Sequence, residues 1–141
     1  MKKSVSDLDK LIKKMDPKLD QRKFYFASVS EEYLMNLANF LDHIKCIFRE
    51  EEGLTIIFSE DVIENVNELT KKVSGPFAFI SLGAFTDLTG DIGFLSNIDT
   101  KLAKSGISLN INSGYYHDHL FVPYEKAESA IKILNEMSSG R

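Results

Sequence analysis

The sequence predicts an α+β protein built from two similar units, each with an antiparallel sheet and helices packed on one face. Two observations lead to this prediction. Short runs rich in β-branched and aromatic residues alternate along the chain with stretches of helical periodicity. The order of these elements in the first half then begins again after Ser74-Gly75-Pro76, a turn-forming cluster that predicts an internal boundary.

The first half predicts a helix, a strand, a helix, a hairpin and a further helix. The hairpin has Gly53 in its turn, where a positive φ is needed. The second of the three helices places Leu34, Leu37 and Leu41 on one stripe. In chain order, we expect these elements over residues 8–15, 23–29, 31–41, 45–58 and 59–69.

The second half predicts an amphipathic helix followed by two strands. Leu95, Ile98 and Leu102 fall at helical spacing, and Gly106 follows the last of them, where a left-handed cap is expected. Residues 107–112 alternate apolar and polar, which is typical of a strand with one buried face. Residues 120–122 then form the return strand.

The two halves look like degenerate copies of one unit. Residues 24–29 resemble residues 77–82, and the strand and helix over residues 54–69 resemble residues 120–134. The alternative is a chance similarity of short apolar segments. Each copy has the element order of a ferredoxin-like fold. We therefore expect a lead-in helix over residues 1–22, a first unit over residues 23–74 and a second over residues 75–141.

Composition limits the partners of this chain. Its 141 residues, 43% of them apolar, suffice for one ordinary core or for two small cores that share an interface. The net charge of -4 is spread along the chain, so no basic surface for nucleic acid or an anionic membrane is expected. The two N-terminal lysines are not followed by the apolar run that a signal peptide requires. The single cysteine, Cys46, cannot form an intramolecular disulfide, which is consistent with a reducing compartment. We expect a cytoplasmic protein with no nucleic-acid or membrane partner.

The stretch from Asp91 to Pro123 runs Asp-x-Gly-x-Leu, helix, Ser-Gly-Ile and two strands. This order resembles the ACT family of small regulatory domains that bind amino acids. Its ending, GYYHDHLFVP, is similar to that of short tandem ACT-like proteins of unassigned function. The resemblance covers residues 77–137 by motif and the first half by topology only. It implies two ACT-like units and a regulatory role.

The loop before the helix of the second half is the candidate ligand site. Gly83, Gly90 and Gly93 permit close backbone approach, and the helix start offers N–H groups to a carboxylate. Tight turns without a ligand are the alternative. The resemblance to ACT domains assigns further residues of the loop, the next strand and the final strand to an amino-acid ligand. They are Asp91, Ile92, Gly93, Phe94, Asn110, Ile111, Asn112 and Asp118.

Metal binding and catalysis have weaker signals. On a strand, His117 and His119 would share one face at a spacing that lets two imidazoles hold one metal, but no third ligand lies nearby in the sequence. We expect these histidines to be structural. The chain has no nucleophile elbow, phosphate-binding loop or dinucleotide motif. We therefore expect no metal, no cofactor and no enzymatic activity.

Two functions remain open at this point. The first is an amino-acid sensor that forms a homo-oligomer and acts on a separate partner protein. The second is a ligand-free assembly module that dimerises through sheet edges and through Tyr115, Tyr116 and His117.

Overall fold

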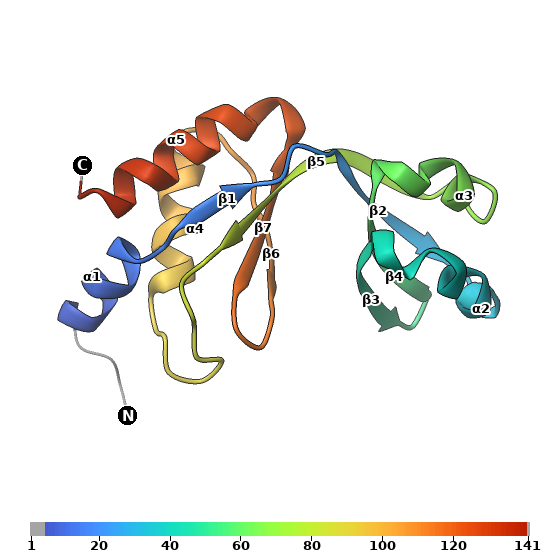
Figure 1. Ribbon diagram of the computed structural model, residues 1–141, viewed down its shortest axis with the longest axis horizontal. Helices are drawn as coiled ribbons and strands as arrows, with labels where there is room; N and C mark the ends of the chain where they lie inside the picture. Colours follow the sequence, from blue (N-terminus) through green and yellow to red (C-terminus); the bar gives the residue numbers. More distant parts are fainter. Residues whose placement is uncertain (1–4, 141) are drawn as a thin grey trace. The chain divides into compact units, whose positions relative to one another are not determined.

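The computed structural model describes residues 5–140, which form two compact units (Figure 1). The central unit, named for its place in the sequence, is Arg22–Phe77. The terminal unit combines Met1–Gln21 with Ala78–Arg141. The sequence predicts a separate lead-in over residues 1–22, whereas the described residues up to Gln21 make their contacts with the C-terminal part of the chain.

The central unit has four antiparallel strands in the order β3-β4-β2-β5, which is the ferredoxin-like order. Its strands are β2 (Phe24–Val29), β3 (Ile44–Glu50), β4 (Gly53–Ser59) and the first half of β5 (Val73–Leu82). Short helical segments connect them: η1 (Glu31–Tyr33), α2 (Leu34–Leu37) and η2 (Ala38–His43) after β2, then η3 (Glu60–Val62) and α3 (Ile63–Asn67) after β4.

The terminal unit repeats this arrangement with its fourth strand taken from the N-terminal part of the chain. Strand β1 pairs antiparallel with the second half of β5, and β7 and β6 follow in that order (Figure 1). The strands are β1 (Pro17–Leu19), β6 (Asn110–Ser113) and β7 (Asp118–Pro123). The helices are α1 (Val5–Lys13), α4 (Phe94–Lys104), η4 (Tyr124–Lys126) and α5 (Ala127–Ser138). No helix in the described part of the chain is long and apolar enough to cross a membrane.

Each unit has its own apolar core, and the predicted helical stripe of the second half is confirmed. Ile98 and Leu102 of α4 are fully buried against Leu120 and Val122 of β7. In the central unit, Phe58 is among the residues that form a separate core on the helix side of the sheet. The mixed α+β fold with two ferredoxin-like units is therefore as predicted.

The prediction that Leu34, Leu37 and Leu41 share one buried face of a helix over residues 31–41 is wrong. Leu37 is fully buried, but Leu34 and Leu41 are 43% and 52% exposed. The segment consists of one α-helical turn between 3-10 turns, and Phe40 leaves helical geometry with φ of -140°. A 3-10 turn has three residues per turn, so positions spaced for an α-helix do not share one face there.

The strand predicted over residues 107–112 begins only at Asn110. The N–H groups of Gly106 and Ile107 donate to the carbonyls of Ala103 and Leu102, at 2.9 and 3.1 Å. Gly106 has φ of +73°, so this is the left-handed cap that its position predicts. Because the cap takes the N–H of Ile107, that residue is buried without joining the sheet.

The Ser74-Gly75-Pro76 cluster lies inside β5 and does not end it. The pairing of β2 with β5 shifts register between the pairs Phe24 with Phe77 and Phe26 with Ser74. Proline lacks an N–H, so an irregular point in a ladder tolerates it.

Candidate functional site

A loop of residues 83–93 joins β5 to α4 in the terminal unit, and its start is fixed against the N-terminal segment. The N–H groups of Gly83 and Ala84 donate to the carbonyls of Asp16 and Met15, at 3.0 and 3.3 Å. A Cβ atom on Gly83 would overlap the Asp16 side chain. This glycine is thus required for close packing of the loop against Asp16.

Two carboxylates hold the middle of the loop. Oδ1 of Asp87 accepts hydrogen bonds from the backbone N–H and the hydroxyl of Thr89, at 2.9 and 3.0 Å. Oδ2 of Asp91 accepts from the backbone N–H of Asp87. Asp91, which the resemblance assigns to a ligand, therefore uses one of its oxygens to shape the loop.

The loop ends at the start of α4, where Gly93 is the N-cap with φ of +91°. No side chain of the described residues caps this helix, so acceptors for its first N–H groups have to come from elsewhere. Phe94 is 1% exposed and belongs to the core, so only its backbone could meet a ligand. Ile92, in contrast, is 60% exposed.

The other half of the site is the hairpin between β6 and β7. The Thr86 N–H donates to the carbonyl of Tyr116 at 3.0 Å, and Nδ1 of His117 lies 3.2 Å from the carbonyl oxygen of Ala84. The Phe85 ring stacks on the His117 ring with centroids 5.0 Å apart. These contacts hold the loop against the hairpin turn, and both lie at the same end of the terminal unit (Figure 1).

Asp118 is the first residue of β7 and pairs with Ser113 of β6. It alternates with Leu120 and Val122, which lie in the core under the helices, so it is on the helix side of the sheet. The residue is only 3% exposed. Aspartate is rarely buried to this extent, so the position suits either a structural role or a binding role.

Strand β6 lies at the edge of the sheet and pairs with β7. Ile111 lies opposite Leu120 and packs against the core, so Asn110 and Asn112 are on the other face. The structure thus brings together the loop, the hairpin turn and Asp118. Asn110 lies at the opposite end of β6 from that turn.

The two histidines of the hairpin have separate roles. His117 lies in the turn, before β7 begins, whereas the ring of His119 stacks on the Phe79 ring with centroids 5.6 Å apart. Among the described residues, no group of three or more His, Cys, Asp and Glu side chains could hold a metal ion. The expected absence of a metal stays a prediction.

Comparison with protein families identifies both halves of the chain. One ACT domain model matches residues 3–67, and a second ACT domain model matches residues 77–136. The first match begins ahead of β2, so it includes N-terminal residues that pack in the terminal unit. No curated protein matches the chain.

Solved structures show the same two-domain fold. A Vibrio cholerae protein of unknown function, described as a possible transport protein, is 32% identical, with a TM-score of 0.79; the match covers 95% of this chain and 98% of that one. The regulatory subunit of aspartate kinase from Thermus thermophilus is 12% identical over 86% of this chain and 96% of that chain, with a TM-score of 0.62. Aspartokinase III of E. coli, solved with aspartate and ADP, is 14% identical over 86% of this chain and 32% of that chain, with a TM-score of 0.60.

Proposed function

Because the chain belongs to the ACT domain family, with two ACT domains in tandem, we propose that it senses an amino acid and acts on a separate partner protein. Membership of this family supports a small-molecule-binding regulatory role. The structural relatives include a regulatory subunit of aspartate kinase and an aspartokinase solved with aspartate. A regulatory rather than a catalytic role is part of the proposal.

The buried carboxylate of Asp118 is the observation that best supports an amino-acid ligand. A free amino acid carries an ammonium group and a carboxylate a few bonds apart. The ammonium group would pair with the carboxylate of Asp118, and the ligand's carboxylate would accept hydrogen bonds at the uncapped start of α4. An ammonium next to a buried carboxylate recovers part of the cost of burying that charge.

The ligand site belongs to the terminal unit alone in this proposal. In the central unit, β2 ends at Val29 and the first helical turn begins at Glu31, so no loop of comparable length exists there. If only one of the two ACT domains carries a ligand site, each chain should bind one ligand.

We further propose that the protein is a homo-oligomer. Light scattering after size-exclusion chromatography would measure its oligomeric state directly.

A thermal-shift screen against the amino acids tests the proposed function. At about 100 times Kd, a one-site ligand stabilises the folded protein by about 2.7 kcal/mol. We expect at least one amino acid to raise the melting temperature, and we expect the Asp118→Asn variant to lose that shift. Glu52→Gln is the matched control, because Glu52 is an exposed acid in the hairpin turn of the central unit.

The unliganded Asp118→Asn protein supplies a second readout. If the carboxylate serves a ligand and not the fold, replacing it by a neutral amide of the same size should leave the melting temperature unchanged or raise it. A large fall would mean that the carboxylate supports the fold instead. If no amino acid at millimolar concentration shifts the wild-type melting temperature, the ligand-free assembly module replaces the sensor as the favoured function.

A further inference from the structure

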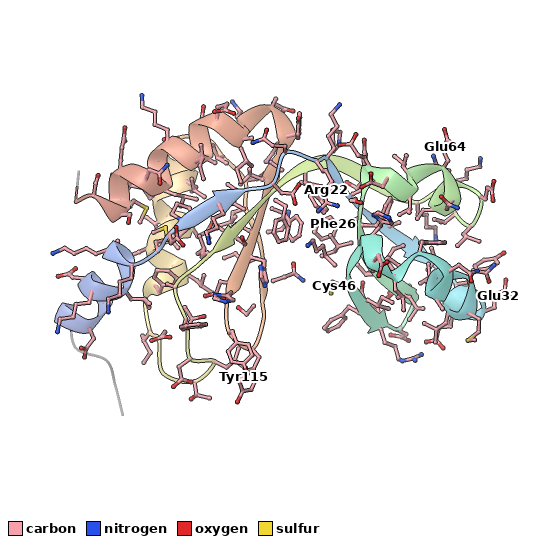
Figure 2. All side chains as sticks on the ribbon, in the orientation of Figure 1. Arg22, Phe26, Glu32, Cys46, Glu64 and Tyr115 are labelled. Carbon is pink, nitrogen blue, oxygen red and sulfur yellow. The ribbon has the colours of Figure 1, made fainter. Side chains whose placement is uncertain are left out.

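A second feature of the terminal unit lies on the same loop and hairpin turn as the proposed amino-acid site, but does not include Asp118 or the start of α4. Phe85, Tyr115 and Tyr116 are 74%, 76% and 63% exposed, although their rings contact one another. Figure 2 shows Tyr115 at the tip of the hairpin between β6 and β7. Rings this exposed contribute little to the core, since hydrophobic stabilisation scales with the area removed from water.

The rings meet at steep angles. Tyr115 and Tyr116 have centroids 4.9 Å apart and an interplanar angle of 68°, and Phe85 meets Tyr116 at 6.3 Å and 69°. Edge-to-face contacts of this kind are the usual preference of aromatic pairs, and the exposed fractions show that much of each ring stays open to solvent. Aromatic cages that bind quaternary ammonium groups are likewise built from several accessible rings.

The three rings line a hollow of about 480 Å³. This volume is in the range of small-molecule sites. Among the described residues that line it, Asp87 is the only one with a carboxylate, and none is a lysine or an arginine. The hollow is therefore apolar with a negative contribution, from the carboxylate and from the electron-rich ring faces.

Contacts within the protein hold part of the wall of the hollow. The Thr86 N–H bonds the Tyr116 carbonyl, and Phe85 stacks on His117. The Asp87 carboxylate is fixed by its two hydrogen bonds from Thr89. A preformed site loses less conformational entropy on binding.

We propose that this hollow is an aromatic cage that binds an organic ammonium group. A cation near the faces of Phe and Tyr rings is attracted by the ring quadrupole, and a methylated ammonium also fills apolar space. The Asp87 carboxylate adds a favourable charge without closing the hollow. The same ammonium chemistry is found in a free quaternary amine and in a methylated lysine side chain of a partner protein.

Choline is the probe for this proposal, and 3,3-dimethylbutan-1-ol is its uncharged control of matching shape. Binding can be followed by the NMR signals of the tyrosine rings, which report contact directly. We expect choline to bind at least about tenfold more tightly than the alcohol, since only the cation gains from the ring faces. Equal affinities, or no binding of choline or of the amide of Nε-trimethyl-lysine, would overturn the proposal.

Single variants test the location. Tyr115→Ala and Phe85→Ala should each weaken choline binding by at least about tenfold. Phe48→Ala is the matched control, because Phe48 is also exposed (64%) but lies on β3 of the central unit. If Phe48→Ala weakens binding as much as Tyr115→Ala does, the cage is not the site.

Two further comparisons identify the source of the cation and separate this site from the proposed sensor. Tighter binding of the trimethyl-lysine amide than of choline would indicate a methylated side chain, and the reverse order a free amine. Asp118→Asn should leave choline binding unchanged because Asp118 does not line the hollow. If Asp118→Asn abolishes it, the ammonium binds at Asp118 and the cage assignment fails.

Discussion

The two units share one strand order but differ in the connection between their first strand and their first helix. In the central unit, one residue separates the end of β2 at Val29 from the helical turn that starts at Glu31. In the terminal unit, β5 ends at Leu82 and α4 begins at Phe94, with a loop of residues 83–93 between them. The same fold therefore has a direct connection in one unit and a long loop in the other, and the proposed site uses that loop.

The helices differ in the same direction. In the terminal unit α4 and α5 have 11 and 12 residues, whereas α2 and α3 of the central unit have 4 and 5. A helix of several turns presents a start with aligned N–H groups and a dipole, which a single turn lacks. Within residues 5–140, only the terminal unit combines a long connecting loop with such a helix start.

Two aspartates show the contrast at the level of single side chains. In the central unit, Oδ2 of Asp61 accepts a hydrogen bond from the Ser59 hydroxyl at 2.7 Å and lies 3.5 Å from both Arg22 and His43. Asp61 is thus tied into the fold. Asp118 of the terminal unit is much more deeply buried, at 3% exposed. We infer that Asp61 supports stability, and the proposed function gives Asp118 a role in binding.

The largest expected effect is on the free energy of unfolding, when a buried aromatic residue near the loop is replaced and compared with an exposed one. Phe94→Ala removes a fully packed core ring and should lower the free energy of unfolding by about 3–5 kcal/mol. Phe85→Ala should change it by no more than about 0.5 kcal/mol, because that ring is exposed. Urea denaturation of both variants measures the difference. Similar losses would mean that Phe85 supports the fold and is not reserved for binding.

Two glycines with positive φ give the next effect. At Gly53, with φ of +146°, a Cβ atom would lie 2.6 Å from the Val29 carbonyl oxygen, so Gly53→Ala adds a backbone clash to left-handed strain. We expect a loss of about 2–5 kcal/mol. Gly106, with φ of +73°, has no atom within 4 Å of a new Cβ, so Gly106→Ala should cost about 1–2 kcal/mol. Thermal unfolding should rank the two variants in this order.

The aspartate contrast predicts a dependence on pH. The hydrogen bond from Ser59, with smaller contributions from the charges of His43 and Arg22, holds the pKa of Asp61 below its usual value of 3.8. A lowered folded-state pKa means that the ionised carboxylate stabilises the fold above the unfolded pKa, and that this stabilisation is lost as the pH falls through the folded pKa. Asp61→Asn should therefore be less stable than wild type at pH 7.

The difference in stability between Asp61→Asn and wild type should shrink as the pH falls below about 4, where the carboxyl becomes protonated in the unfolded protein. It should disappear once the pH is also below the lower folded-state pKa. Melting temperatures measured from pH 7 to pH 2 provide the check. Asp118→Asn is the companion variant, and it should show no loss at pH 7. A loss at pH 7 in Asp118→Asn and not in Asp61→Asn would reverse the proposed roles.

The smallest expected effect is that of metal removal. We expect a chelator to leave the melting temperature unchanged, because His117 and His119 make contacts to Ala84 and Phe79 within the protein. Purified protein should contain no stoichiometric zinc. Zinc near one equivalent that is lost in a His119→Ala variant would contradict this prediction.

Local patterns in the sequence predicted most of the fold. The spacing of Ile98 and Leu102 predicts α4, and Gly106 predicts where that helix ends. Both predictions succeed because helical periodicity and capping depend on neighbouring residues. Strand β1 was missed, since three residues carry no alternation and their pairing partner is the distant end of β5. The assignment of the N-terminal segment to the terminal unit depends on that pairing.

The candidate site was less predictable for the same reason. The glycines marked the loop, but the burial of Asp118 and the contact of Thr86 with Tyr116 arise only when the loop and the hairpin meet in the folded chain. The hydrogen bonds that make Asp87 and Asp91 parts of the loop framework likewise have no signature in composition. Sequence alone therefore located the loop and left its internal contacts unspecified.

Hydrogen exchange tests most directly the claim that the terminal unit alone carries the ligand site. The amino acid with the largest thermal shift would be added at saturation, and backbone exchange would be compared with and without it. We predict slower exchange over residues 84–97 and 113–118, with residues 30–67 of the central unit unchanged. Protection confined to residues 30–67, or equal protection of both units, would contradict the account.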